Sequence, residues 1–449
     1  MKYLNTTAIK SFAICCQLIL LSSFVQAQKT TNSPYSRYGY GIVNPNQFNS
    51  NFGTGGIGYA WRPSVYKPQI NDSLARSNAK LNDRRTNFIN TKNPASFSNI
   101  SLTVFETGIL SRSTQSTSGS QTAQNNNTTL SHMSVAFPLS SKMGVAFGLR
   151  SYSSVGYDYQ DQVIVNTVTA NNAYEGSGGL NEVFIGTGYE VHKNLSVGLS
   201  GKYLFGRVER DKRVVFDTDD VTNFFNTIDR SEINYNTFTY DIGFQYFKNI
   251  NNYYRFVVGL NLAPVSEAKG NESGLIASYT GDSGAERIKD TTLSFQGRSL
   301  TTPLASTIGG GFSIERIGEW SFNFDVTSQS LGNETIGDNI TLNDATIMNV
   351  GIEKFNDVTA FGSYFKRMGY RGGFRYNSSI LNVNGTDISE MAISVGFSMP
   401  LRKSFSTLNF GMELGTRGED NNGLTKEDFF NIHFGLTIND KWFIKRKYD

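Results

Sequence analysis

Residues that form disulfides and most metal sites are rare in this chain, whose 449 residues include 2 cysteines and 3 histidines. Both cysteines, Cys15 and Cys16, lie in an apolar segment near the start, and neither follows the Leu-small-small pattern of a lipoprotein cleavage site. Without that segment the chain carries no thiol. This excludes disulfides, thiolate catalysis and cysteine metal sites in the mature protein.

Long apolar runs are also scarce. A helical membrane bundle needs several stretches of ~20 apolar residues, whereas this chain has a single such run and a mean hydropathy of -0.32. The run follows Lys2 and Lys10 and ends in small residues before Gln28. A basic start, an apolar centre and a small-residue exit predict a secretory signal peptide over residues 1–27, so we expect export from the cytoplasm.

Neither sign of charge dominates, since 41 basic residues face 38 acidic ones. This balance gives no electrostatic reason to expect nucleic acid as a partner. What the chain has instead is 44 glycines and 13% aromatic residues, too many for a disordered polypeptide. No proline-rich or charged linker divides it, so we expect one large folded body.

From about residue 99 onward, apolar residues alternate with small or polar ones, which is the period of a strand between two different environments. Met143, Val145 and Phe147 alternate with Gly144 and Ala146. The same phase returns in segment after segment up to the end of the chain. One face is therefore apolar throughout, and the other is polar and rich in glycine.

The breaks between these segments alternate in length. Short breaks are 138–141, 191–194, 249–252, 316–319 and 400–404, and long ones are 113–128, 159–177, 211–231, 269–293, 331–344, 377–387 and 417–427. Alternating tight turns and long hydrated loops are typical of an outer-membrane β-barrel, with turns in the periplasm and loops outside. We therefore predict fourteen strands, near 99–112, 129–137, 142–158, 178–190, 195–210, 232–248, 253–268, 294–315, 320–330, 345–355, 363–376, 388–399, 405–416 and 428–443.

The predicted fold class is all-β, a 14-stranded antiparallel transmembrane β-barrel. In lipid every backbone N–H and C=O must pair within the protein, and a chain without apolar helices achieves this as a closed barrel. The alternative is a soluble all-β protein. Strands of this length with aromatic faces would be overlong and prone to association in water, which argues against that alternative.

Residues 28–98 do not alternate and are too polar to face lipid. A barrel of this size needs a filling, because side chains alone fill the interior of only about eight strands. We therefore expect an N-terminal hatch or plug in the lumen over 28–98, and the transmembrane barrel over 99–449 with a short basic periplasmic tail. A periplasmic tail is the alternative for 28–98, but aromatic residues such as Tyr35, Tyr59 and Trp61 favour packing.

Motifs of known chemistry are weak. Gly53–Gly58 matches G-x-G-x-x-G, but no apolar strand precedes it and the segment is exported, so we expect no dinucleotide or other cofactor. His132 and His433 share the polar phase while His192 lies in a turn, so we expect lumen-facing polar residues and no pair with the i, i+4 or cross-strand geometry of a metal site. The chain has no G-x-S-x-G, and enzymatic activity is not expected. The acidic run 217–220 lacks EF-hand spacing and fits a solvated loop.

Two short motifs carry a family resemblance. Gly53–Ala60 reads Gly-Thr-Gly-Gly-Ile-Gly-Tyr-Ala, and Asn93–Phe97 reads Asn-Pro-Ala-Ser-Phe just before a first strand that contains Phe105-Glu-Thr-Gly. Together with the fourteen strands, they resemble the hatch of the FadL/TodX outer-membrane family over essentially the whole mature chain. Pro303–Ala305, near the start of the eighth strand, also resembles the family pattern.

The resemblance implies a barrel in the outer membrane of a Gram-negative bacterium, surrounded by outer-membrane lipids, that passively takes up small hydrophobic molecules. It also implies an outer pocket, a movable hatch and lateral exit through a kinked strand. The residues it assigns to the hatch and ligand path are Gly55, Gly58, Tyr59, Trp61, Asn93, Pro94, Ala95 and Phe97.

One departure from the family supports a second hypothesis. The join from Trp61 to Lys92 is longer and more charged than in the family, and the start 33–39 and the finish 442–447 resemble barrels of Bacteroidota-like bacteria. There the same fold also serves as a non-transporting accessory subunit of a larger outer-membrane protein secretion or assembly complex. Transport predicts an apolar pocket built from hatch aromatics. An accessory role predicts a sealed lumen and an exposed apolar patch on loops or turns.

Overall fold

The computed structural model describes residues 33–63, 87–165, 168–217, 224–281, 285–332, 334–335, 340–355, 363–401, 404, 406–421 and 423–440. The predicted signal peptide, the basic tail, most of the charged join between Trp61 and Lys92 and most of the acidic run lie outside these residues. Within them, no helix is long and apolar enough to cross a membrane.

The elements are strands and short 3-10 helices. In chain order they are η2 (Pro34–Arg37), β1 (Ile42–Val43), η3 (Phe52–Thr54), η4 (Pro94–Asn99), β2 (Thr103–Ser118), β3 (Gln121–Ser140), β4 (Met143–Ser151), β5 (Ser153–Val165), β6 (Val168–His192), β7 (Leu195–Phe216), β8 (Asn226–Asn249), β9 (Tyr254–Ala263), β10 (Ser266–Thr280), β11 (Arg287–Leu304), β12 (Ser306–Arg316), β13 (Trp320–Ser330), β14 (Glu334–Thr335), β15 (Ile340–Leu342), β16 (Ala345–Lys354), η5 (Tyr364–Arg367), β17 (Gly369–Asn377), β18 (Leu381–Val383), β19 (Thr386–Asp387), β20 (Glu390–Pro400), β21 (Thr407–Arg417) and β22 (Lys426–Asp440).

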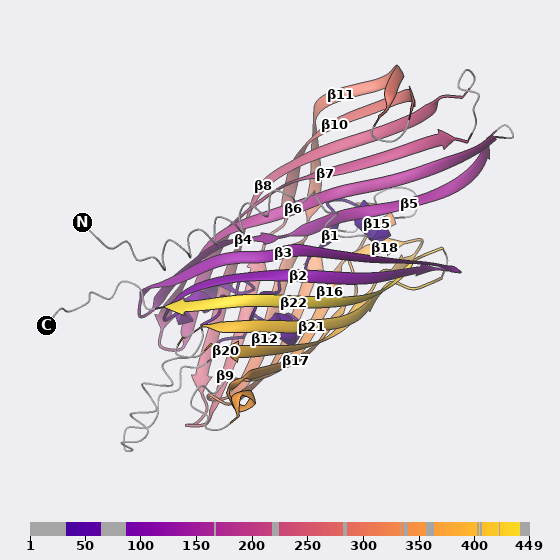
Figure 1. Ribbon diagram of the computed structural model, residues 1–449. Coiled ribbons are helices and arrows are strands. Elements are labelled where there is room, and N and C mark those ends of the chain that lie inside the picture. The colour runs from indigo at the N-terminus through magenta and orange to yellow at the C-terminus, as the bar shows by residue number, and fades with distance from the viewer. Residues whose placement is uncertain are drawn as a thin grey trace, which may run out of the picture.

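The long strands form a closed antiparallel barrel (Figure 1). The last strand closes on the first, with Phe105 opposite Ile438 and Ile109 opposite Phe434. The pairs β4 and β5, β9 and β10, and β11 and β12 are each one wall strand with a short interruption, which gives 14 strands. Closure leaves no edge within the membrane, so all backbone groups there are paired. The predicted fold class is confirmed.

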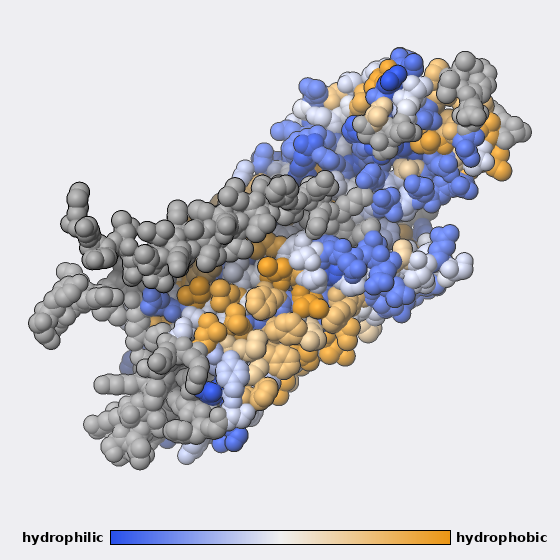
Figure 2. Space-filling model, in the orientation of Figure 1, coloured by the Kyte–Doolittle hydropathy of each residue, from blue (hydrophilic) through white to orange (hydrophobic). Residues whose placement is uncertain are grey.

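The outside of the wall is apolar, as the alternation predicts. An exposed large apolar residue lies on each wall strand: Ile109, Met133, Phe147, Ile185, Leu199, Phe238, Leu260, Ile308, Phe322, Ile352, Phe374, Ile393, Leu414 and Phe434. Figure 2 shows the resulting hydrophobic band over the lower part of β20 to β22 and a hydrophilic surface beyond it. The inside is lined by buried polar and charged side chains, among them Glu182, Asp241 and Glu413.

Several of the predicted long loops are wrong. The segments 113–128, 159–177, 211–231 and 269–293 are largely the ends of long hairpins, since β6, β7 and β8 have 25, 22 and 24 residues. A membrane crossing needs only ~9–11 residues, so these strands continue far beyond the apolar band, as a tall wall on one side of the barrel (Figure 1). In water both faces of such a strand can be polar, and the alternation that marks the membrane part disappears.

Two further strand predictions need correction. The predicted strand 363–376 begins with the 3-10 helix η5, and β17 begins only at Gly369. Pro303 and Leu304 lie not at the start of the eighth strand but next to a break inside it, where Ala305 separates β11 from β12. Below this break β12 pairs with both β9 and β13, whereas above it β11 pairs, among the described strands, with β10 alone.

The N-terminal segment lies inside the barrel. We call residues 33–63 and 87–100 the plug. Its side chains Phe48, Ile89 and Phe97 pack with Ala146 and Phe184 of the wall in a buried apolar cluster. The strand β1 of the plug pairs with β5, where Ile42 lies opposite Ser154. The predicted plug in the lumen is therefore confirmed, and the exact ends of this domain stay a prediction.

Candidate functional site: the plug and its seat in the wall

The first plug motif is a tight loop held by one wall carboxylate. Gly55 and Gly56 adopt left-handed φ angles of 71° and 82°, which favour glycine. The loop then points the amides of Gly58 and Tyr59 at Asp325 of β13, and they donate hydrogen bonds of 2.7 and 3.1 Å to its Oδ2. The glycine pattern noted in the sequence thus serves a turn around a carboxylate, and no nucleotide is needed to explain it.

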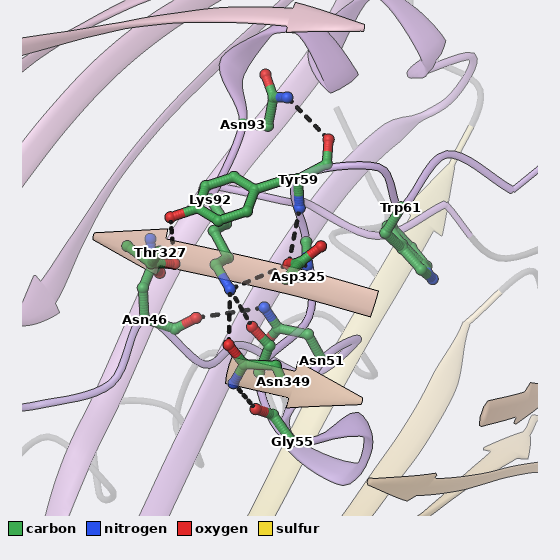
Figure 3. A network of polar contacts seen from close by, with 12 residues as sticks. Asn46, Asn51, Gly55, Tyr59, Trp61, Lys92, Asn93, Asp325, Thr327 and Asn349 are labelled. Atoms are coloured by element: carbon green, nitrogen blue, oxygen red, sulfur yellow. Dashed lines mark hydrogen bonds and ion pairs between the residues drawn. The ribbon is translucent and has the colours of Figure 1, made fainter. Parts of the chain in front are cut away.

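Lys92 completes this network from the second half of the plug (Figure 3). Its Nζ lies 3.1 Å from Oδ2 of Asp325 and donates a 2.8 Å hydrogen bond to the carbonyl oxygen of Gly56. It also lies 4.4 Å from the centre of the Tyr59 ring. Burial lowers the pKa of Lys92, and the Asp325 carboxylate opposes that shift. One ion pair therefore joins both halves of the plug to β13.

The second plug motif is a capped helix. The side chain of Asn93 accepts a hydrogen bond from the amide of Ala95, and Pro94 occupies the first turn, where no amide hydrogen is required. The Nδ2 of Asn93 donates hydrogen bonds to the carbonyl oxygen of Tyr59 at 2.8 Å and to the carbonyl oxygen of Phe244 in the wall at 3.1 Å. Asn93 thus ties the helix to the glycine loop and to β8 at once.

The wall meets the plug with glycines. A Cβ atom added at Gly259 would lie 1.8 Å from the carbonyl oxygen of Tyr59, and one at Gly198 would lie 2.3 Å from the amide nitrogen of Ala95. Comparable collisions with the plug occur at Gly144, Gly188, Gly243, Gly309, Gly351, Gly373, Gly396, Gly411 and Gly435. We call these eleven glycines the glycine seat. Glycine inside a strand often marks a close approach of another segment. Here the seat leaves out wall side chains where the backbone or the side chains of the plug touch the wall.

All eight residues predicted for the hatch and ligand path lie buried between plug and wall: Gly55, Gly58, Tyr59, Trp61, Asn93, Pro94, Ala95 and Phe97. Hydrogen bonds connect the two motifs through Asn93 and Tyr59. Trp61 donates its indole N–H to Glu353 of β16 at 2.9 Å. Their role in ligand passage stays a prediction.

A cavity of about 370 Å³ lies between the plug and the upper wall. Tyr59 is the one predicted path residue among those that line it. The plug contributes further tyrosines such as Tyr38 and Tyr40, and the wall contributes Leu204 and Leu304. Charged side chains from the wall also reach it, so the cavity combines aromatic, aliphatic and charged groups.

Two of the three histidines lie close together inside the barrel. His132 of β3 and His433 of β22 flank β2, and their parallel rings are 5.9 Å apart. Phe48 stacks on His132 and Phe52 on His433, at 3.9 and 4.9 Å between ring centres, which makes four rings in one column. Within the described ranges no three His, Cys, Asp or Glu side chains are grouped to hold a metal ion. The column therefore packs plug against wall.

Two partners in the site were missed by sequence reasoning. Asp325 falls on the polar phase of the predicted strand 320–330, but nothing in the sequence pairs it with Lys92, which lies 233 residues earlier. The available signal was an acidic residue in the middle of a strand predicted to span the membrane. Such a buried charge requires a partner of opposite charge. The basic residues of the plug segment are candidates for that partner.

The family model described as BamG matches residues 8–449. Among solved structures, the Ralstonia pickettii toluene transporter TbuX is similar, with a TM-score of 0.56, 11% identity, and 88% of this chain and 99% of that chain covered. The Pseudomonas putida toluene transporter TodX gives a TM-score of 0.52 at 12% identity, with 87% and 97% covered. At these identities the likeness concerns the fold alone. No curated protein matches the sequence.

Proposed function

This chain belongs to the BamG family, and on that premise we propose that it is a sealed outer-membrane barrel serving as an accessory subunit of a larger protein-assembly complex. The proposal takes up the second hypothesis from the sequence, which predicted a sealed lumen and an exposed apolar patch. The family membership is in keeping with that role. The barrel fold, its apolar band and its polar interior are all compatible with it.

The glycine seat is the observation that carries this proposal. A plug that must move in each transport cycle needs free space around it, whereas backbone and side-chain atoms of this plug lie directly on wall glycines around much of the lumen. Close-packed protein interiors have low compressibility. The buried pair Lys92–Asp325 adds a polar tie that is costly to break. Both features favour a plug that stays in place.

An apolar tip on the tall wall supports partner binding. At the ends of β5 and β7, the segments 163–165 and 214–216 are apolar, and Ile164 is 79% exposed. Charged residues of β7 between Arg207 and Arg213 separate this tip from the membrane band. From Tyr203 to Val214 the strand covers roughly 35 Å at about 3.3 Å per residue. The tip therefore lies beyond lipid, where an apolar patch favours contact with protein.

A second candidate function rests on the cavity. A volume of about 370 Å³ lined by tyrosines and leucines falls in the range of small-ligand sites. The fold is shared with proteins described as toluene transporters. Binding of a small hydrophobic molecule above the plug is thus the alternative, with or without its passage.

The two proposals are separated by one preparation of the full-length protein from its native membrane in mild detergent. An accessory subunit is expected to bring down a membrane partner in stoichiometric amount, and to show no large conductance in a planar bilayer. A transporter is expected to come alone and to bind toluene, measured by calorimetry. Large conductance of the intact protein would contradict the sealed barrel, and a partner-free preparation would contradict the accessory role.

A further inference from the structure

The apolar band ends in a row of aromatic and basic side chains on the outside of β13, β16, β17 and β20. Trp320 of β13 lies opposite Lys354 of β16. Tyr370 of β17 lies opposite both Lys354 and Phe397 of β20. Ile352, two residues from Lys354 on the same face of β16, is an exposed residue of the band. Aromatic residues of this kind are enriched where lipid meets water, so the row marks the membrane edge at the short-turn end of the barrel.

The 3-10 helix η5 lies directly against this row. The Tyr370 hydroxyl donates a 2.8 Å hydrogen bond to the carbonyl oxygen of Phe365. The Tyr364 hydroxyl donates one of 3.0 Å to the carbonyl oxygen of Pro400, at the end of β20. In Figure 1 the orange coil of η5 lies at the end of the barrel away from the tall wall. Phe365 is nevertheless 68% exposed, so a fixed turn presents apolar surface at the membrane edge, where burial in lipid is favourable.

Three cations stand beside these rings. The Nζ of Lys354 lies 5.6 Å from the centre of the Tyr370 ring, and the central guanidinium carbon of Arg367 lies 5.3 Å from the centre of the Tyr364 ring. Lys366, between the two aromatic contacts of η5, is exposed. In the part of the chain that the structure describes, none of the three forms an ion pair, and the Nε of Arg367 is buried without a hydrogen-bond partner. The turn therefore offers positive charge and unused donors next to an apolar surface.

Cations beyond the opposite edge of the band are arranged differently. Arg207 of β7 forms ion pairs with Glu209 and Glu232, and Arg298 of β11 pairs with Glu272. These arginines are more than half exposed, yet each has its counter-charge within the protein. The charge at η5 is left for an anion from outside the chain.

We propose that η5 and the adjoining row bind one anionic phospholipid of the surrounding membrane. Lys354, Lys366 and Arg367 hold its phosphate through charge-assisted hydrogen bonds, and its acyl chains lie on Phe365 and on the apolar band. Basic clusters at a membrane surface recognise anionic lipids in this way. In outer-membrane barrels the short turns lie in the periplasm, so the lipid belongs to the inner leaflet. The inference does not depend on either candidate function.

The position of the site selects a lipid over a soluble anion or an acidic protein segment. Lys354 and Ile352 are two residues apart on one strand face, which is ~7 Å, and Ile352 is 57% exposed within the band. A phospholipid carries its phosphate next to its acyl chains, so one molecule matches both residues. A free phosphate leaves Phe365 uncovered, and a protein segment would have to displace lipid from the band.

Native mass spectrometry of the full-length protein in detergent tests the site. Phosphatidylglycerol is compared with phosphatidylcholine of the same acyl chains, because only the first has a net charge. One tight phosphatidylglycerol adduct is expected. Lys354→Gln with Lys366→Gln should weaken it about 25-fold, from about fivefold for each lysine near an anionic headgroup. The matched control, Lys142→Gln with Lys193→Gln, removes two exposed lysines from other short turns and should leave the adduct unchanged.

Phe365→Ser separates a phospholipid from a free anion. This variant keeps all three cations, so a site for phosphate alone would be unaffected, whereas phosphatidylglycerol should bind several times more weakly. Each variant should keep the unfolding temperature of the wild type, since the substituted side chains are exposed. Equal binding of the two lipids, an equal loss in the control, or unchanged binding by Phe365→Ser would overturn the lipid site. A photoreactive side chain at position 365 that crosslinks in cells to a protein instead of lipid would overturn it as well.

Discussion

The ammonium group of Lys92 and the carboxylate of Asp325 form an ion pair of 3.1 Å inside the barrel, with side chains only 12% and 1% exposed. The same carboxylate oxygen accepts the amides of Gly58 and Tyr59. One residue of β13 therefore fixes two plug segments that are separated by the charged join. Loss of this pair should loosen the plug before it affects the wall.

Removing one partner of the pair should be costly. Asp325→Asn leaves the buried ammonium group of Lys92 without its counter-charge, and Lys92→Met does the same to the carboxylate of Asp325. Each substitution is expected to destabilise the plug by about 3–5 kcal/mol. The double variant should cost less than the sum of the two. The measurement is thermal unfolding in detergent, followed by limited proteolysis of the plug.

The exposed pair Lys426 and Asp428 provides the control for that experiment. Its side chains are 44% and 53% exposed, so Lys426→Met should change stability by at most ~1 kcal/mol. Equal costs at the buried and exposed pairs would show that the Lys92–Asp325 contact does not hold the plug.

Two adjacent glycines of β17 test the glycine seat. A Cβ atom at Gly373 would lie 2.1 Å from the carbonyl carbon of Thr54 in the plug, whereas one at Gly372 meets only a side-chain methyl group at 3.7 Å. Gly373→Ala should therefore overpack the interface by roughly 1–3 kcal/mol and raise bilayer conductance. Gly372→Ala should stay within about 0.5 kcal/mol. Similar behaviour of the two variants would argue against a tight seat.

The membrane part of this fold is predictable from sequence because lipid and lumen impose a period of two. Ile185 and Leu199 point outward as the alternation predicts. The hairpins above the membrane are not predictable in the same way, since 113–128 is polar on both faces and still forms strand. The stacking of His132 and His433 depends on barrel closure, which makes the first and last strands neighbours. The glycines of the polar face are visible in the sequence, but the plug atoms that they meet are not.

A pair of isoleucines tests where the membrane ends. Ile185 and Ile164 are both exposed, at 63% and 79%, but the first lies in the apolar band and the second at the tip of the tall wall. Lysine on the lipid face near the bilayer centre costs ~2–4 kcal/mol. Ile185→Lys should therefore destabilise the barrel, and Ile164→Lys should not, measured by unfolding in lipid vesicles. Ile164→Lys should instead reduce co-purification of the partner. If Ile164→Lys destabilised the barrel as much as Ile185→Lys, the tip would lie in lipid.

The contact between Tyr35 and Thr425 predicts a sensitivity to alkaline pH. The Tyr35 hydroxyl donates to the carbonyl oxygen of Thr425 at 2.5 Å and accepts from its amide at 3.1 Å. Burial raises the pKa of Tyr35 to about 12, from its ordinary value of 10.0. The neutral phenol is thus favoured in the folded protein, while the unfolded chain already loses its proton near 10.0. The contribution to stability is complete below that pH and declines as the pH rises toward about 12.

Tyr35→Phe isolates that contribution, because phenylalanine cannot ionise. The variant should be less stable than the wild type at neutral pH, since Thr425 loses a hydrogen-bond partner. Between pH 10 and about 12 the difference should shrink, as the wild type alone pays for keeping its phenol protonated. Chemical unfolding in detergent at closely spaced pH values measures both curves. Parallel curves across this window would mean that the Tyr35 hydroxyl titrates as it does in water, and that the plug start is not packed against Thr425 in solution.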